Sequence, residues 1–133
     1  MGVLRQLSYE ECLLRLDAGG VGRVAITSHA LPAIVPVNYA RSDGHILFRT
    51  EPGGMLAHGC DGTVVAFEID GVDDTGTAGW SVLVVGAATL LPGPAEADVV
   101  SAIRGDRDQL VSISLSQVSG RAVEESEYAV RSR

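Results

Sequence analysis

Apolar positions near the start of the 133-residue chain recur at the spacing of a helix. Over residues 9–18 they fall on one face of a 3.6-residue repeat, which indicates an amphipathic helix. Ser8 and Glu11 have the form of a capping box, in which a hydroxyl and a carboxylate satisfy free backbone N–H groups. Gly19 and Gly20 then end the periodic segment. The pattern therefore predicts one helix that packs its apolar stripe against the core.

After residue 19 the pattern changes to short runs rich in β-branched residues, separated by turn signals such as Asp43-Gly44. Short helices are expected at 52–59 and 95–104. Most connections are too short to carry a helix between parallel strands, which favours antiparallel pairing. The sequence therefore predicts a mainly β fold, a six-stranded antiparallel barrel with short flanking helices. The expected strands are residues 20–27, 31–40, 45–50, 63–70, 80–91 and 110–123, the last with a bend near Gln117.

Two of these strands should depart from a regular ladder. The strand at 31–40 contains Pro32 and Pro36, and because proline cannot donate to the ladder, this strand should lie at an edge or contain a bulge. The long apolar strand at 80–91 should be covered on both faces or kinked at Gly86. We expect residues 1–123 to form a single domain and residues 124–133 a polar C-terminal tail.

The composition excludes several classes of function. All ten basic residues are arginine, so neither a Schiff-base lysine nor a lysine-containing phosphate loop is available. The net charge of −7 argues against a nucleic-acid partner, which needs a concentrated basic surface. No apolar run reaches the roughly 20 residues of a membrane helix, and the first residues lack the apolar core of a signal peptide. We therefore expect a cytoplasmic protein that does not bind a membrane.

Cysteine and histidine usage gives no sign of a metal site. Cys12 and Cys60 lie far apart without a CxxC motif, which indicates two reduced, partly buried thiols. His29, His45 and His58 show no metal-ligand spacing. No serine–histidine–aspartate set or carboxylate pair emerges from the sequence, an absence consistent with an enzyme whose cofactor carries the chemistry.

The stretch FRTEPGGM, residues 48–55, is a candidate anion site. The planar guanidinium of Arg49 suits phosphate oxygens, and Thr50 adds a hydroxyl beside a proline–glycine break. Met55 stands where a second basic residue would close the cradle. The alternative for Arg49 is a salt bridge at the surface or at an interface.

Six stretches occur in one order along the chain: LSYEECLLRL, GVGRVAI, PAIVPVNYA, HILFRTEPGGML, VAFEID and GWSVLVVGAA. Together they resemble the flavin-binding split-barrel proteins related to pyridoxamine 5′-phosphate oxidase. The likeness is greatest to a small actinobacterial-type branch that includes relatives of nitroimidazole reductases. It extends over residues 7–123, and its most persuasive pieces are PVNY, FRTEPG and GWSVLV.

The resemblance implies a six-stranded split barrel that forms a homodimer, with two FMN sites in the grooves between the subunits. One strand segment would run along the flavin ring, the end of the third strand would face the phosphate or ribityl chain, and the fifth strand would approach across the interface. The implied cofactor-binding residues are Val35, Pro36, Val37, Asn38, Phe48, Arg49, Thr50, Met55, Trp80 and Ser81. The alternatives are that Trp80 is a core or interface residue, and that Tyr39 caps the barrel with its hydroxyl on a backbone group.

The chain departs from the family pattern at the phosphate site. A basic residue commonly follows Pro-Gly-Ser or Pro-Gly-Thr in that pattern, whereas this chain has Gly54 and Met55. Relatives also often carry arginine where this chain has Val85. One charge-assisted hydrogen bond contributes about 1.5–3 kcal/mol, so its loss would weaken FMN binding about tenfold to a hundredfold.

The leading hypothesis is an FMN-dependent oxidoreductase that works as a homodimer on an unidentified small organic molecule. One alternative is a non-catalytic split-barrel protein that binds haem, with Met55 and His58 as soft ligands, or a deazaflavin or another small molecule. A further alternative is a dimer that has lost its cofactor. Oxidation of pyridoxamine phosphate itself is not expected, since a second phosphate would need a further basic cluster.

Overall fold

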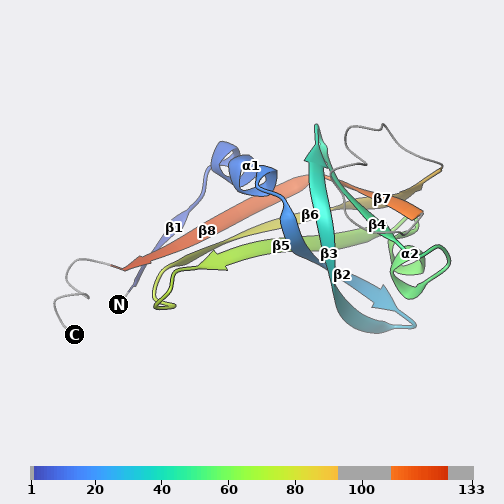
Figure 1. Cartoon of the computed structure of the whole chain (residues 1–133), viewed down its shortest axis with the longest axis horizontal. Helices are drawn as coiled ribbons and strands as arrows, with labels where there is room; N and C mark the ends of the chain where they lie inside the picture. The colour runs from blue at the N-terminus through green and yellow to red at the C-terminus, as the bar shows by residue number, and fades with distance from the viewer. Residues whose placement is uncertain (1, 93–108, 126–133) are drawn as a thin grey trace.

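The computed structural model describes residues 2–92 and 109–125. All strands in these ranges belong to one antiparallel sheet, most of which is curled into a barrel (Figure 1). Strands β6, β5, β2, β3, β4 and β7 are neighbours in that order, and pairing of β6 with β7 closes the ring. This confirms the six-stranded antiparallel barrel. The strands are β1 (Gly2–Gln6), β2 (Gly20–Ser28), β3 (Leu31–Ser42), β4 (His45–Thr50), β5 (Val64–Val72), β6 (Gly79–Leu91), β7 (Gln109–Ser114) and β8 (Gln117–Glu125).

Strand β6 belongs to two parts of the sheet. Its first half, Gly79–Val85, pairs with β8, and its last residues, Ala88–Leu91, pair with β7. Between them Gly86 passes so close to the backbone of Ser114 that a Cβ would overlap its carbonyl oxygen. Strand β6 thus changes partner next to a glycine that lets another backbone approach closely, and the kink expected at Gly86 stays a prediction. Strands β1 and β8 and the adjoining ends of β5 and β6 extend from the barrel as an arm (Figure 1).

Within the described ranges, two helices accompany the sheet, α1 (Tyr9–Asp17) and α2 (Met55–Cys60). The capping box is confirmed: Glu11 N–H donates to Ser8 Oγ at 3.1 Å, and Ser8 N–H donates to the Glu11 carboxylate at 3.0 Å. Helix α2 begins at Met55 and not at residue 52, because Gly53 takes a left-handed φ of 71° that a helix cannot accommodate.

The core fills the barrel with large apolar side chains from alternate positions of the strands. Ile46 and Phe48 of β4 are fully buried in it, whereas Leu47 belongs to a small separate cluster with Leu110. Successive residues of β4 thus point to opposite faces of the sheet. Among the described residues, no helix has the length and apolar character needed to cross a bilayer.

Three features were not predicted correctly or lie outside the described residues. Strand β1 was missed because all five of its residues are exposed and it is defined only by pairing with β8. The last strand is two strands, since residues 115–116 break it. The helix expected at 95–104 and most of the tail expected at 124–133 lie outside the described residues.

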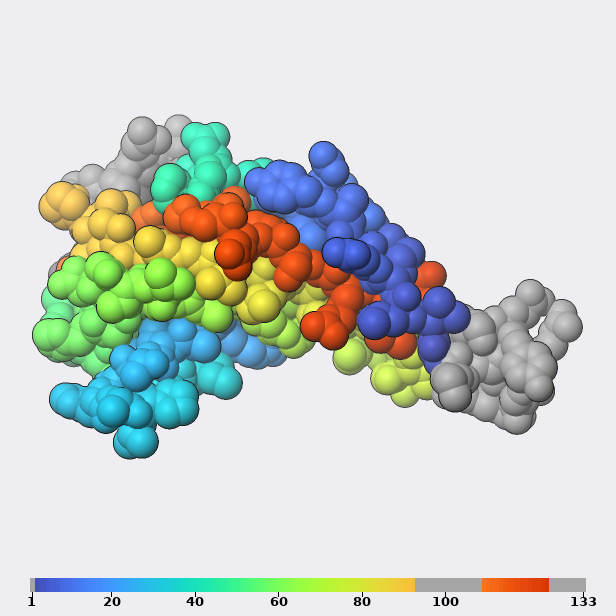
Figure 2. Space-filling model, turned by 180° about the vertical axis from the view of Figure 1, so that it is seen from behind, coloured from blue at the N-terminus to red at the C-terminus, as the bar shows by residue number. Residues whose placement is uncertain are grey.

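Seen from the opposite side, β8, β6, β5 and β2 present their outward faces next to one another (Figure 2). Cross-strand register places Leu83 of β6 between Glu68 and Ser119 on this face. Leu83 is 41% exposed and Val123 is 39% exposed. We refer to the exposed surface of these four strands as the outer sheet face.

Candidate functional site

A groove of about 400 Å³ runs between the edge of β3, the end of β4 and the start of α2. It brings together seven of the ten residues predicted to bind a cofactor. Its walls also include residues that sequence reasoning did not assign to the cofactor. The lining is Val35, Pro36, Val37, Asn38, Arg49, Thr50, Glu51, Gly54, Met55 and Leu56.

The β3 wall of the groove is an unpaired strand edge. Residues 31–39 of β3 pair with β2 on one side, but pairing with β4 on the other side begins only at Tyr39. Within the described chain, the segment Val35–Asn38 therefore has one edge without a strand partner. This confirms the edge position expected from Pro36. Backbone N–H and C=O groups on such an edge are available to a ligand.

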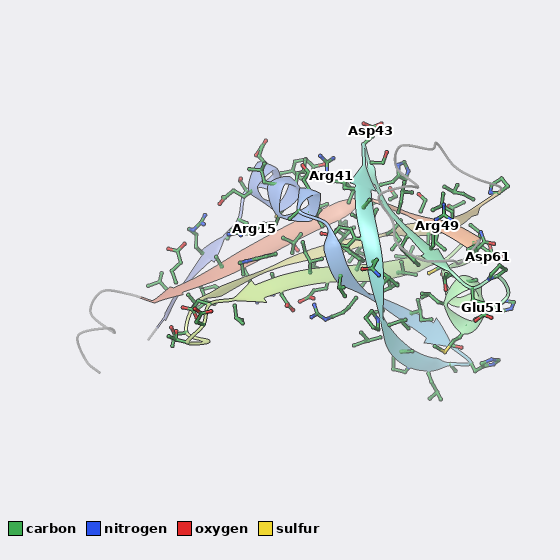
Figure 3. All side chains as sticks on the ribbon, in the orientation of Figure 1. Arg15, Arg41, Asp43, Arg49, Glu51 and Asp61 are labelled. Carbon is green, nitrogen blue, oxygen red and sulfur yellow. The ribbon has the colours of Figure 1, made fainter. Side chains whose placement is uncertain are left out.

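Arg49 and Thr50 bring the polar groups of the groove to the end of β4. Arg49 is half-buried and Thr50 is only 4% exposed. Glu51 follows directly and lines the same groove, and Figure 3 shows Arg49 and Glu51 at the α2 end of the barrel. The groove thus offers a guanidinium and a hydroxyl to an anion, with a carboxylate at its margin.

The turn from β4 into α2 forms another wall of the groove. A Cβ at Gly54 would lie 3.3 Å from the carbonyl oxygen of Glu51, so a larger residue would press on this turn. Met55 is 51% exposed and lines the groove. Sequence reasoning did not assign Leu56 to the site, since its buried side chain fits the pattern of a core residue.

Three predicted residues do not line the groove. The Phe48 side chain is fully buried in the barrel core, so from this position only its backbone is near the site. Trp80 and Ser81 instead line a different hollow, of about 440 Å³, on the arm of the molecule. The role implied for them, across a dimer interface, stays a prediction.

Trp80 has close contacts within its own chain. The guanidinium carbon of Arg15 lies 4.5 Å from the centroid of the Trp80 ring, within the range of a cation–π interaction. A Cβ at Gly71, its cross-strand partner, would come within 2.7 Å of the indole Nε1, so the ring covers this glycine. Figure 3 places Arg15 on α1, away from Arg49. The contacts account for a packing role of Trp80.

A second hollow, of about 640 Å³, adjoins the groove at Met55. The tip of the β2–β3 hairpin and α2 form its walls. Its lining is Thr27, Ser28, His29, Gly53, Met55, His58 and Gly59. The sequence did not indicate this hollow, because no local pattern shows that the hairpin tip at His29 meets α2.

The haem alternative finds limited support in this geometry. Met55 and His58 lie one turn apart on α2 and line the same hollow. Side chains three residues apart on a helix share one face. They are therefore unsuited to ligate one iron from its two opposite sides. Among the described residues, no group of three or more histidine, cysteine or acidic side chains is placed to hold a metal ion.

Both cysteines are free and buried in the structure. Burial raises the pKa of the Cys60 thiol to about 11 and also raises the pKa of Cys12. Because the thiolate is the reactive form, these thiols are poor nucleophiles at neutral pH. The thiols, expected to be partly buried, are almost fully buried, with Cys12 1% and Cys60 0% exposed.

A closed antiparallel barrel with a strand-edge groove at one end defines the class of split-barrel proteins. The family model described as pyridoxamine 5′-phosphate oxidase matches residues 8–122. The chain therefore belongs to the pyridoxamine 5′-phosphate oxidase family, as its sequence motifs suggested.

Similar proteins support this assignment. An uncharacterised protein of Mycobacterium tuberculosis is 38% identical over 94 residues, which are 67% of this chain and 62% of that protein. The match thus spans less than two thirds of that relative. The structure of an FAD-binding protein from Mycobacterium smegmatis is 29% identical, with a TM-score of 0.72, and covers 90% of this chain and 98% of the other. An FAD-binding protein from Mesorhizobium loti is 27% identical, with a TM-score of 0.77, and covers 94% and 100%.

Proposed function

We propose that this protein is a flavin-dependent oxidoreductase, with the flavin held in the groove along β3. The observation that carries the proposal is the meeting of an unpaired strand edge with Arg49 and Thr50 in one groove of about 400 Å³. The FAD-binding proteins from M. smegmatis and M. loti share this fold at 29% and 27% identity, which supports a flavin as the ligand.

The groove residues fit such a ligand in type and order. Val35 and Val37 turn their side chains toward the barrel core, so this segment offers the groove mainly its backbone edge, which can pair with the polar rim of a flat ring. Arg49 and Thr50, at the other end, suit a phosphate. A bound flavin would supply hydride and electron transfer between a donor, such as a reduced nicotinamide, and a small organic acceptor.

The role of the protein groups is to bind and orient. The Arg49 guanidinium would neutralise part of the phosphate charge, and Glu51 at the margin would oppose a second negative charge. The β3 edge would fix the position of the ring through backbone groups, whose geometry does not depend on side-chain rotamers. The small-molecule substrate would lie on the exposed side of the groove. As to cellular location, we propose the cytoplasm.

We further propose that the working form is a homodimer built on the outer sheet face. Leu4, Ser81, Leu83 and Arg121 border one hollow on this side of the molecule. Exposed aliphatic side chains on a sheet favour burial against a partner. Because Trp80 and Ser81 do not reach the groove of their own chain, a contact with the flavin would require the groove of a second copy.

The visible spectrum of the purified protein tests the proposal most directly. We expect flavin absorption in the protein as isolated or after addition of FMN or FAD, and a flavin that stays with the protein through gel filtration. A colourless protein that retains neither flavin would refute the proposal.

Substitution of Arg49 tests the site. Arg49→Gln should weaken flavin binding about tenfold to a hundredfold, since one charge-assisted hydrogen bond is lost. Arg5→Gln is the matched control, because Arg5 pairs with Glu11 and Glu124 on the arm and does not line the groove. Equal flavin affinity in the Arg49 variant and the control, measured by fluorescence titration, would place the flavin elsewhere.

A further inference from the structure

The second hollow continues the flavin groove past Met55. Met55 is shared by the two linings, and Gly54 and Gly53 line the first and the second respectively. The boundary between them thus consists of two glycines and one flexible side chain that is 51% exposed. A Cβ at Gly53 would have no atom within 4 Å, so the space beside this glycine is open.

The fold places the hairpin tip and α2 together through direct packing. A Cβ at Gly59 would come within 2.6 Å of the Ile26 side chain, so α2 rests on β2 at this glycine. The β2–β3 turn then follows within a few residues, with His29 and Ala30 at φ of 51° and 64°. Two successive positive φ values define a tight two-residue turn, which holds His29 at the rim of the hollow.

The chemistry of the second hollow differs from that of the whole chain. Its described lining has two imidazoles and two hydroxyls and contains no carboxylate, although the chain has 17 acidic and 10 basic residues. Hydroxyls suit phosphate and ribose oxygens, and an imidazole offers a flat face to a purine. The lining holds no guanidinium either, so these groups suit a polar ligand with an aromatic end that is held by hydrogen bonds and stacking.

The charges of the groove are poorly matched to FMN, a flavin that ends in a terminal phosphate. The terminal phosphate of FMN is close to a dianion, and the groove offers it one guanidinium, with Glu51 nearby and Met55 in place of a second cation. In a dinucleotide the same two charges are divided between two phosphates. One arginine is then better matched to the first phosphate, and the chain of the ligand continues over Met55.

We propose that the second hollow holds the distal phosphate and adenosine of FAD, so that this protein selects FAD over FMN. The inference rests on the proposed flavin function. His58 and His29 provide the surfaces for the adenine, and Thr27 and Ser28 the hydroxyls for the phosphate and ribose. The ligand then crosses Met55 between the groove and the second hollow. The absence of a basic residue at position 55 therefore leaves room for the longer ligand.

Equilibrium titration of the full chain with FMN and with FAD tests this assignment. The wild type should bind FAD about tenfold more tightly than FMN, the size expected from stacking of one base. His58→Ala and His29→Asn should each remove most of this preference and leave FMN affinity within about twofold. Asparagine is chosen at position 29 because it tolerates a positive φ. His45→Ala is the matched control, since His45 is exposed and lines neither cavity.

A third variant, at position 55, tests whether Met55 contributes to the preference for FAD over FMN. Met55→Arg should strengthen FMN binding about tenfold and reduce the preference for FAD, because it restores a second cation beside the first phosphate. FMN bound as tightly as FAD by the wild type, or equal losses for both flavins in His58→Ala, would overturn the assignment and leave the flavin function standing. Failure to bind either flavin would overturn both.

Discussion

At the scale of single residues, Tyr39 shows how one side chain joins separate elements. It is 3% exposed, and its hydroxyl donates to the Leu16 carbonyl at the end of α1 over 2.9 Å. Its ring meets Phe67 edge-on, with centroids 4.9 Å apart. The alternative that Tyr39 caps the barrel with its hydroxyl on a backbone group is confirmed. Burial, with a smaller contribution from the Asp17 charge, raises the pKa of Tyr39 to about 12.

This raised pKa predicts a loss of stability in alkali. An unfolded tyrosine ionises near pH 10, whereas folded Tyr39 keeps its proton to about pH 12. The stability from this group is therefore fully present below about pH 10 and is lost as the pH rises through the folded pKa. Tyr39→Phe should cost about 0.5–1.5 kcal/mol at pH 7 and should remove this part of the alkaline slope.

Urea unfolding of the wild type and Tyr39→Phe from pH 7 to pH 11.5 measures the difference. The gap between the two proteins should narrow or change sign above about pH 10. A gap that stays constant over the whole range would show that Tyr39 ionises equally in the folded and unfolded states. Tyr9→Phe is a suitable control, since Tyr9 is 52% exposed.

At the scale of elements, β6 determines how the barrel closes. It pairs with β8 as far as Val85 and with β7 from Ala88, and Gly86 lies between the two segments. The carbonyl of Ser114 occupies the space that a side chain at position 86 would need. The absence of a Cβ at Gly86 is therefore a condition for β7 and β8 to share one strand.

Gly86→Ala should destabilise the protein by about 3 kcal/mol or more, because backbone atoms of two strands must move apart. Gly44→Ala is the control: it lies in the β3–β4 turn, and a Cβ there would meet no atom within 4 Å. It should change the stability by less than about 0.5 kcal/mol. Chemical unfolding of both variants measures these values, and a Gly86→Ala protein as stable as the control would contradict the closure described for β6.

At the scale of the whole molecule, the outer sheet face and the groove lie on different parts of one chain. Figure 1 shows the arm with β1 and β8 extending away from the barrel end that carries α2. Trp80 and Ser81 lie on the arm side, and seven of the other eight predicted cofactor residues line the groove. The proposed dimer would unite the arm of one subunit with the groove of the other.

Leu83→Glu tests the proposed dimer. A charge at this exposed aliphatic position should shift the protein from dimer to monomer, because it would be buried unpaired in the interface. Leu14→Glu is the control, since Leu14 is 71% exposed on α1 and is not part of the outer sheet face. Analytical ultracentrifugation measures the outcome. A wild-type monomer, or a Leu83→Glu protein that remains dimeric, would exclude this face as the interface.

Local patterns were sufficient for much of the fold and for most of the candidate groove. The helix cap at Ser8 and the alternation in β4 depend on neighbours two to four residues apart, and both agree with the structure. The motif around Arg49 and the prolines of β3 likewise identified a strand end and a strand edge. Such features are encoded in short stretches of chain, and the sequence alone therefore determined them.

Only the tertiary structure decided which distant segments meet. Pairing between β1 and β8 joins the two ends of the described chain and creates a strand whose residues carry no burial pattern. Packing of Gly59 on Ile26 places His58 beside the hairpin at His29 and so forms the second hollow. Trp80 is held by Arg15 and lies outside the groove of its own chain. These outcomes depend on contacts between residues far apart in sequence, where spacing along the chain holds no information about distance in space.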